Sequence, residues 1–271
     1  MTDWTGKAGI YLVAYGRHAH DCAYHLIASI HKYSPGIPIC LVCEGFEKDY
    51  RKPADPLPRW SPTPVPEGFK KRLLADDIVI PSAMRDRRAR YQKTKIWSLA
   101  PAEWELVLYM DVDMLVKTKL DAFFNILSDG WEMVVTLSPP DAALVHHAQR
   151  RKYEAENLFT NKALGGDRWL QIAGGVWAWR RCEATETLLK TFHTEWRRFK
   201  HTDQQAMMRA LWKCPVRMWT FGTEWNTFVH KRDYKRSVGI YHFATAARAW
   251  VVKHQGRKLW REMSAQFREK E

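Results

Sequence analysis

The sequence predicts an α/β fold in which helices pack against a mixed, mostly parallel sheet. Apolar runs of strand length alternate along the chain with longer segments of helical periodicity, which is the pattern of βαβ units. The 271 residues, 46% of them hydrophobic, can bury one substantial core and are too apolar for a disordered chain. No apolar run approaches the ~20 residues of a membrane-spanning helix, so no transmembrane segment is expected.

The first strand–helix–strand unit lies near the start of the chain. Residues 10–15 and 37–42 are apolar runs of strand length, and between them apolar side chains recur at helical spacing over residues 22–33. The segment Ser34-Pro35-Gly36 ends this helix. We expect ligands at the carboxyl ends of these strands, where open α/β sheets bind them.

A proline-rich segment follows the second strand. Six prolines between Arg51 and Gly68 exclude a helix or a central strand and predict an extended surface loop, which is either a lid or an insertion. Periodicity predicts further strands at residues 78–80, 105–110, 131–137 and 175–179, and further helices at residues 85–99, 183–198 and 202–212.

Charge and cysteine content restrict the partners and the compartment. Lysine and arginine number 43 against 30 acidic residues, and the net charge of +13 favours nucleotides, nucleic acids, anionic polymers or an anionic membrane face. The five cysteines lack zinc-site spacing, and Cys40 and Cys43 lie within an apolar strand, so we expect packed, reduced thiols. The first residues show neither a secretory signal nor an anchor, which predicts a cytoplasmic protein.

Two carboxylates follow the apolar strand at residues 105–110. Asp111 and Asp113 are two positions apart, so in extended chain their side chains point the same way. Such a pair can hold a divalent cation whose remaining positions are filled by water and phosphate oxygens. The alternative is a strand that ends in two solvated acids.

The residues around this pair resemble a known family. Residues 109–116, preceded by residues 93–99, resemble the core of retaining GT-A glycosyltransferases of the glycogenin and bacterial lipopolysaccharide galactosyltransferase type. Further segments are similar to that family in the same order, namely Ala173–Val176, Asp203-Gln204, Trp225-Asn226 and His242–Trp250. The resemblance implies a GT-A fold with residues 1–271 as one catalytic domain. Its N-terminal half would bind the nucleotide sugar and its C-terminal half the acceptor, with a basic tail at about residues 251–271.

The resemblance also implies a metal site. By position, Asp111, Asp113 and His242 would bind the cation, and imidazole with carboxylates suits Mn²⁺, with Mg²⁺ as the alternative. Read without the resemblance, His242 lies in an apolar run and would be a packed strand histidine. The implied donor is a nucleoside diphosphate sugar, with a UDP-sugar expected.

Further residues are assigned to the donor by the same resemblance. Tyr15, Lys93, Asp111 and Arg248 would bind it, and the cations Lys93 and Arg248 would neutralise the departing diphosphate. The alternative for Lys93 is a solvated position in a basic helix.

Asp203 and Gln204 would face the transferred sugar as the catalytic residues. The family is thought to retain configuration by front-side attack, which needs no dedicated base. The alternative is that Thr202 or Asp203 is the N-cap of a helix, so that Asp203 would only satisfy backbone donors.

Some positions depart from the family pattern. Ala173 replaces an asparagine that contacts the sugar, and Arg17 and Ala19 replace an aspartate and a tyrosine after the first strand. Thr245 and Ala249 replace a glycine and a proline in the last motif. The donor base and sugar are therefore left open.

Three basic stretches, at residues 150–152, 230–236 and 253–270, bear on the acceptor. Together with the 14 tryptophans they fit an acceptor glycan, an anionic lipid-linked glycan or a nucleic acid, the last with a hydroxyl-bearing modified base in DNA. A solvated basic surface is the alternative. Two other classes remain, a non-catalytic nucleic-acid-binding protein on a degenerate transferase core and a nucleotidyl or phosphoryl transferase. The Asp–Asp–His set argues against the first, and the lack of a P-loop argues against the second.

Overall fold

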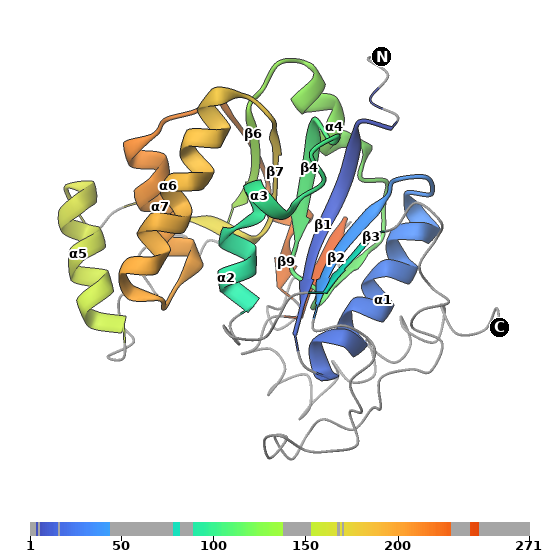
Figure 1. Ribbon diagram of the computed structural model, residues 1–271, viewed down its shortest axis with the longest axis horizontal. Coiled ribbons are helices and arrows are strands. Elements are labelled where there is room, and N and C mark those ends of the chain that lie inside the picture. Colours follow the sequence, from blue (N-terminus) through green and yellow to red (C-terminus); the bar gives the residue numbers. More distant parts are fainter. Residues whose placement is uncertain are drawn as a thin grey trace.

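The computed structural model describes Trp4 and residues 6–15, 17–43, 78–81, 89–137, 153–166, 169, 171–228 and 239–243. Within these residues seven strands form one sheet in the order β3-β2-β1-β4-β7-β6-β8 (Figure 1). Their bounds are β1 Ala8–Ala14, β2 Ile39–Cys43, β3 Ile78–Pro81, β4 Leu106–Met110, β6 Met133–Leu137, β7 Ile172–Arg180 and β8 Met218–Phe221. Only β7 runs antiparallel to its neighbours among these strands, so the predicted mixed, mostly parallel α/β sheet is confirmed.

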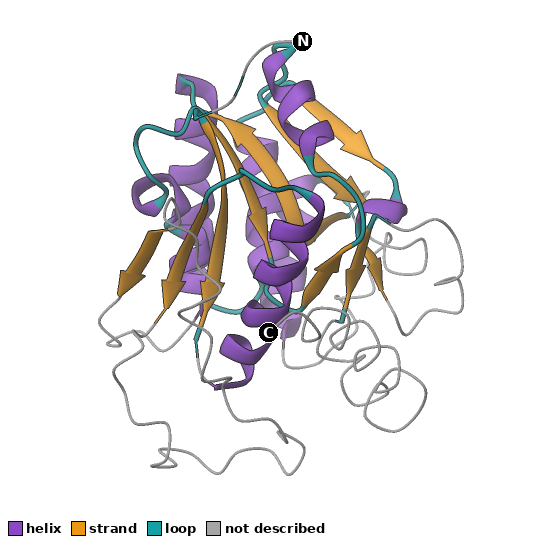
Figure 2. Ribbon diagram, turned by 90° about the vertical axis from the view of Figure 1, so that its right-hand side faces the viewer, coloured by secondary structure: helices purple, strands orange, loops and turns teal. Residues whose placement is uncertain are grey.

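Helices cover both faces of the sheet (Figures 1 and 2). Alternate residues of β1 divide between two cores, because successive side chains of a strand point to opposite faces. Ile10 and Leu12 pack beneath α1 (Arg17–Tyr33) and α4 (Asp121–Ser128). Tyr11 and Val13 pack on the other face, beneath the helices α2 (Ala89–Thr94), α3 (Ile96–Leu99), α6 (Glu183–Phe199) and α7 (Asp203–Lys213).

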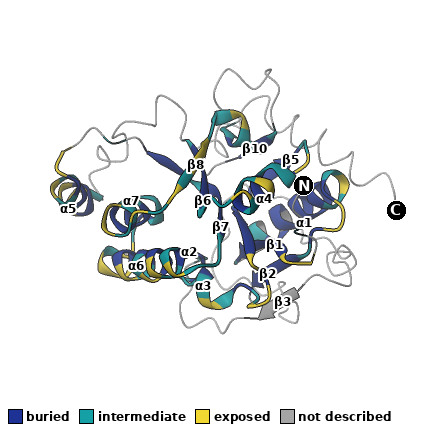
Figure 3. Cartoon of the chain, turned by 90° about the horizontal axis from the view of Figure 1, so that it is seen from above, coloured by how far each residue is buried: buried dark blue, intermediate teal, exposed yellow. Residues whose placement is uncertain are grey.

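The central strands are buried along their whole length. Every residue of β1, β2 and β4 is buried, which explains why these segments are continuous apolar runs rather than alternating ones. In Figure 3 these strands lie at the centre, whereas α6 carries exposed residues on its outer side. All five cysteines are free, and Cys22, Cys40 and Cys43 are buried, as expected for packed thiols. Burial, with the charge of Glu103, raises the pKa of the Cys40 thiol to about 12.

A second, small sheet lies beside the end of β4. It contains β5 (Met114–Val116), β10 (Ile240–His242) and β9 (Thr227–Phe228), in the order β5-β10-β9. The strand β10 is antiparallel to β5, with His242 opposite Met114. A 3₁₀ helix, η4 (Thr223–Trp225), precedes β9. This sheet brings the C-terminal part of the described chain next to the residues that follow β4.

Several element predictions needed correction. Of the helix expected over residues 85–99, residues 85–88 lie outside the described part, and the rest forms two short helices, α2 and α3, separated at Lys95. The strand expected at 175–179 is longer and begins at Ile172. The helix α5 (Glu154–Leu164) and the strand β8 were not predicted. The proline-rich segment at residues 51–68 lies outside the described residues. Among the described helices, each is too short or too polar to span a bilayer.

Candidate functional site

The candidate site lies where β4 ends. Asp111 is the first residue after β4, and Asp113 immediately precedes β5. Two backbone hydrogen bonds fix this turn, since the Asp111 amide donates to the Gly175 carbonyl at 2.8 Å and the Phe243 amide donates to the Asp113 carbonyl at 2.7 Å. The turn is therefore tied both to β7 and to the residue after β10, and each tie carries another part of the site.

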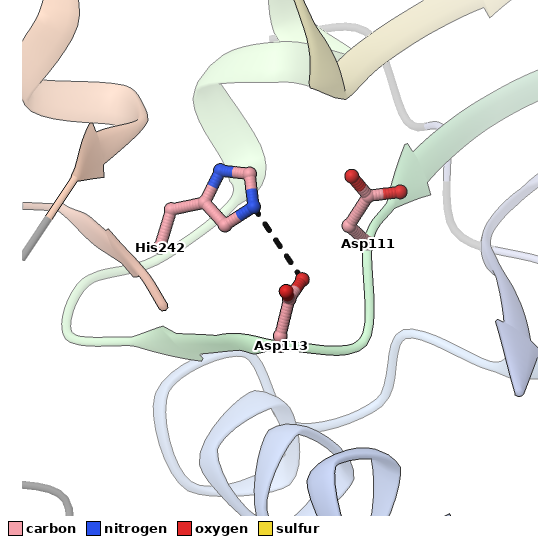
Figure 4. Close-up of side chains that lie close together, drawn as sticks. All are labelled: Asp111, Asp113 and His242. Carbon is pink, nitrogen blue, oxygen red and sulfur yellow. Dashed lines mark ion pairs between the residues drawn. The ribbon is translucent and has the colours of Figure 1, made fainter. Parts of the chain in front are cut away.

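Asp111, Asp113 and His242 converge on one point, which we call the Asp–Asp–His cluster (Figure 4). One potential ligand atom from each residue lies within 4.8 Å of the others. The His242 Nε2 atom is 3.4 Å from Asp113 Oδ1. The side chains of His242 and Asp113 are 7% and 12% exposed, whereas that of Asp111 is 31% exposed, so the cluster opens to solvent on the Asp111 side.

Gly175 keeps the space beside this cluster open. A Cβ atom at this position would lie 2.8 Å from His242 Cε1 and 3.1 Å from Asp111 Oδ2, and 2.5 Å from Met114 Cε. Only glycine fits there without displacing the cluster. The neighbouring Gly174 is different, because a Cβ atom there would make ordinary contacts, the nearest at 3.5 Å from Asp203 Oδ2.

Lys93 links the cluster to the helix side of the site. Its ammonium group lies 3.2 Å from Asp111 Oδ1, 2.5 Å from Asp203 Oδ2 and 2.5 Å from the Gly174 carbonyl oxygen, and 4.5 Å from the centre of the Tyr109 ring. Burial by itself would lower the pKa of Lys93, but Asp111 and Asp203 outweigh it and raise that pKa. Lys93 is therefore a buried, charged bridge, and the alternative of a solvated helix position is wrong.

Asp203 faces the site and is held there by two cations. Besides Lys93, Arg90 contributes its Nε at 3.4 Å from Asp203 Oδ1. Burial would raise the pKa of this carboxyl, but the charges of Lys93 and Arg90 outweigh burial and lower it, so Asp203 is ionised. The N-cap residue of α7 is Thr202, one of the two residues that the sequence offered, and Asp203 is the first residue of the helix. Gln204 donates from Nε2 to the Ile172 carbonyl at the start of β7.

A buried ion cluster behind this helix start supports it. This Arg209 cluster comprises Glu156, Glu195, Arg209 and Lys213. Arg209 donates from Nε to Glu195 Oε2 at 2.9 Å and from Nη2 to Glu156 Oε1 at 3.2 Å. The other Glu156 oxygen, Oε2, accepts from the Thr202 amide at 3.1 Å. The cluster thereby holds the residue that precedes Asp203.

The sequence also assigned Tyr15 and Arg248 to the donor. Tyr15 follows β1 and packs, half-buried, against the core that contains α2 and α6. Arg248 lies outside the described residues, as do Thr245, Ala249 and the three basic stretches.

The sequence analysis assigned no site role to Tyr109 or Arg90, and it marked Asn226 only as part of the family-like segment Trp225-Asn226. The Tyr109 hydroxyl donates to Asp111 Oδ1, and burial together with Asp111 raises its pKa well above the ordinary value, so it stays a donor. The two-residue spacing from Asp111 was a signal for this contact, because such side chains point to the same face of a strand. Asn226 is fully buried beside His242, and its contact crosses between β10 and the end of η4.

The amino-acid sequence was compared with protein families and with curated proteins. No protein-family model matches the chain, and no curated protein sequence matches it.

Solved structures do match. Galactosyltransferase LgtC, in complex with donor and acceptor sugar analogues, gives a TM-score of 0.58 at 15% identity over 95% of both chains. Mouse xyloside xylosyltransferase 1, without ligand, gives 0.54 at 13% identity over 89% of this chain and 98% of that one. The apo WbbM bifunctional glycosyltransferase gives 0.58 at 13% identity over 90% of this chain and 47% of that one. At these identities the likeness shows the fold, which is the predicted GT-A glycosyltransferase fold.

Proposed function

We propose that this chain is a metal-dependent, retaining glycosyltransferase that moves a sugar from a nucleoside diphosphate sugar to a hydroxyl acceptor. The observation that carries the proposal is the Asp–Asp–His cluster, which opens beside Gly175 at the carboxyl edge of a GT-A sheet. The same edge is where open α/β sheets bind nucleotides. We expect a UDP-sugar as the donor and the cytoplasm as the location.

The donor set of the cluster fits a divalent cation. Two carboxylates and one imidazole with ligand atoms within 4.8 Å of one another suit Mn²⁺, and Mg²⁺ is the alternative. A side chain at position 175 would intrude on this space, and its glycine leaves it open. When bound, such a cation neutralises the diphosphate and favours its departure as a leaving group.

The chain's own residues would act on the sugar and on the developing charges. Asp203, ionised because of Lys93 and Arg90, would stabilise the positive charge that develops at the anomeric carbon. Gln204, fixed through the Ile172 carbonyl, would contact the transferred sugar. Lys93 would hold Asp111 and Asp203 at a set distance and supply positive charge near the leaving phosphate.

Retention would follow from attack on the face that the diphosphate leaves. The acceptor hydroxyl would form the new bond to the anomeric carbon while the bond to the phosphate oxygen breaks, and that oxygen would take the acceptor's proton. Tyr15 and Arg248 would contact the nucleoside and the diphosphate. A dedicated base is not required in this scheme.

A glycan is the acceptor that the comparisons favour, since one matched structure is a galactosyltransferase with an acceptor sugar analogue. The lipid-linked glycan and the nucleic acid remain predictions, because the basic stretches on which they depend lie outside the described residues. Nothing on the described surface of the chain favours the nucleic acid over a glycan.

Thermal unfolding with and without Mn²⁺ tests this function, using a panel of nucleoside diphosphates and their sugars. Saturation at one hundred times Kd should raise the Tm of the wild type by about 5 to 10 °C. Asp113→Ala should lose this response and all transfer, whereas Asp129→Ala, at the exposed C-cap of α4, should keep both. Wild-type turnover by Asp113→Ala in metal-free buffer would end the metal hypothesis, and an inverted product anomer would end retention.

A further inference from the structure

We infer that Thr136 and Asn226 are positioning residues that fix the proton of His242 on Nδ1, so that Nε2 is the nitrogen presented to Asp111 and Asp113. The inference rests on the proposed metal site for its purpose, but its geometry stands on the metal-free chain. The hydrogen bonds of this chain join Thr136, Asn226 and His242 to one another and to Val176, and they do not involve the two aspartates.

The three side chains form one buried hydrogen-bonded chain. The Thr136 hydroxyl on β6 lies 3.1 Å from the Val176 carbonyl oxygen on β7. Asn226 Nδ2 lies 3.4 Å from that hydroxyl, and Asn226 Oδ1 lies 2.8 Å from His242 Nδ1. Thr136 and Asn226 are both 0% exposed, so bulk solvent does not compete for their hydrogen bonds.

The direction of each bond follows from the first acceptor. A carbonyl oxygen can only accept, so the single hydroxyl proton of Thr136 is donated to Val176. The Thr136 oxygen is then left as an acceptor, and the Asn226 group that faces it must be the NH₂. The amide orientation is thereby set, and Oδ1 faces His242.

The proton of His242 follows in turn. Because Asn226 Oδ1 can only accept, His242 Nδ1 must carry a hydrogen. Nε2 is left facing Asp113 Oδ1 at 3.4 Å, inside the Asp–Asp–His cluster. In the neutral ring its lone pair points at a carboxylate, an arrangement that a cation between them would make favourable.

The ring plane is fixed as well. The Phe228 ring lies against the imidazole with centres 4.5 Å apart and planes 31° apart. The hydrogen bond between His242 Nδ1 and Asn226 Oδ1 restricts rotation of the imidazole within its own plane. His242 is therefore held in one orientation before any ligand arrives, which lowers the cost of ligation.

Thr136 offers the sharpest test because two hydrogen bonds separate it from the imidazole and it is not among the residues proposed to bind metal or donor. Thr136→Val keeps the shape but removes the hydroxyl, so the Asn226 amide is free to turn and present NH₂ to Nδ1. Thr136→Ser keeps the hydroxyl and is the matched control. The first readout is the ¹⁵N chemical shift of the His242 ring nitrogens in metal-free protein at alkaline pH, assigned by loss of the signals in His242→Gln.

We expect the wild type and Thr136→Ser to show a protonated Nδ1, and Thr136→Val to show a mixture or a protonated Nε2. The second readout is binding of Mn²⁺ alone, which should weaken about 10- to 100-fold in Thr136→Val and stay within about 3-fold in Thr136→Ser. A wild type with its proton on Nε2 overturns the inference even if the variants fail to fold. An unchanged tautomer in a folded Thr136→Val overturns it too.

The two readouts separate this inference from the proposed function. If the wild type binds no Mn²⁺ but carries the proton on Nδ1, the metal site fails and the positioning chain stands. If Mn²⁺ binds equally to Thr136→Val and Thr136→Ser, the metal site stands and the positioning chain fails.

Discussion

Two groups of charged side chains meet at the start of α7 in this protein, and they differ in how their charges are paired. In the Arg209 cluster all four carboxylate oxygens of Glu156 and Glu195 have donors, which are Arg209, Lys213 and the Thr202 amide. At the candidate site three carboxylates lie together, those of Asp111, Asp113 and Asp203, with Lys93 between Asp111 and Asp203 and Arg90 at Asp203. The first group pairs two acids with two bases in the interior, whereas in the second the Asp111 side chain is 31% exposed and the site opens to solvent.

This difference separates a structural cluster from a binding one. Buried charges are tolerated in a folded protein when each is paired and hydrogen-bonded, which describes the Arg209 cluster. Carboxylates that lie this close together and open to solvent repel each other, and a bound cation relieves that repulsion and stabilises the folded chain. The Arg209 cluster and the candidate site are also connected, because Glu156 accepts a hydrogen bond from the Thr202 amide at the start of α7 and Asp203 is the next residue.

The largest effect on stability should come from Arg209→Ala. The change leaves the buried carboxylates Glu156 and Glu195 without their main partner, and breaking such a cluster costs about 3 to 5 kcal/mol of unfolding free energy. Urea denaturation measures it. Asp113→Ala should cost less than about 1 kcal/mol in metal-free buffer, since it also removes the repulsion between this carboxylate and that of Asp111. Equal losses in the two variants would remove the distinction drawn between the clusters.

A smaller, pH-dependent effect is expected for Glu195→Gln. Burial would raise the pKa of the Glu195 carboxyl, but hydrogen bonds from Lys213 and Arg209 outweigh it and lower that pKa. A lowered pKa in the folded state stabilises the protein above the unfolded value of about 4.3, and this stabilisation is lost as the pH falls through the folded pKa.

The free energy of unfolding of the wild type should therefore exceed that of Glu195→Gln most at neutral pH. This difference in free energy should narrow as the pH falls below about 4.3. Unfolding free energies measured from acid to neutral pH test this. A gap that is constant with pH would show that Glu195 has the same pKa in both states.

The sequence was most informative where one physical rule acts alone. The βαβ unit and β4 were predicted because buried parallel strands must be continuous apolar runs. The pairing of Asp111 with Asp113 followed from the two-residue repeat of extended chain. In contrast, α5 was missed because the face it buries is polar. Glu156, Asn157 and Thr160 are buried there against α7, so no apolar stripe marks the helix.

The contacts that complete the site depend on the tertiary fold. Lys93 reaches Asp203 across 110 residues of sequence, and neither spacing nor composition predicts that contact. His242 was placed in the site by resemblance alone, since its own neighbours favour a packed strand residue. The Thr136–Asn226–His242 chain joins β6, the end of η4 and β10, and it could be seen only when these elements were placed together.

The smallest effect should come from the exposed ion pair on α6, and it completes the comparison. Lys190 and Lys213 each contact one glutamate of this helix, at 2.5 Å and 2.6 Å, and both lysines are about half-exposed or more. Their partners differ, because Glu186 is 40% exposed and Glu195 is 2% exposed.

Lys190→Gln should therefore lower the unfolding free energy by only about 0.3 to 0.5 kcal/mol, with no loss left at high salt. Lys213→Gln should cost at least about twice as much, and its cost should persist in salt, because it removes a donor from a buried carboxylate. Parallel urea titrations at low and high ionic strength measure both. Suppose that Lys213→Gln lowered the unfolding free energy as little as Lys190→Gln and with the same sensitivity to salt. Burial of the partner carboxylate would then not determine how much a charge pair stabilises this protein, and the Arg209 cluster would differ from the candidate site in geometry alone.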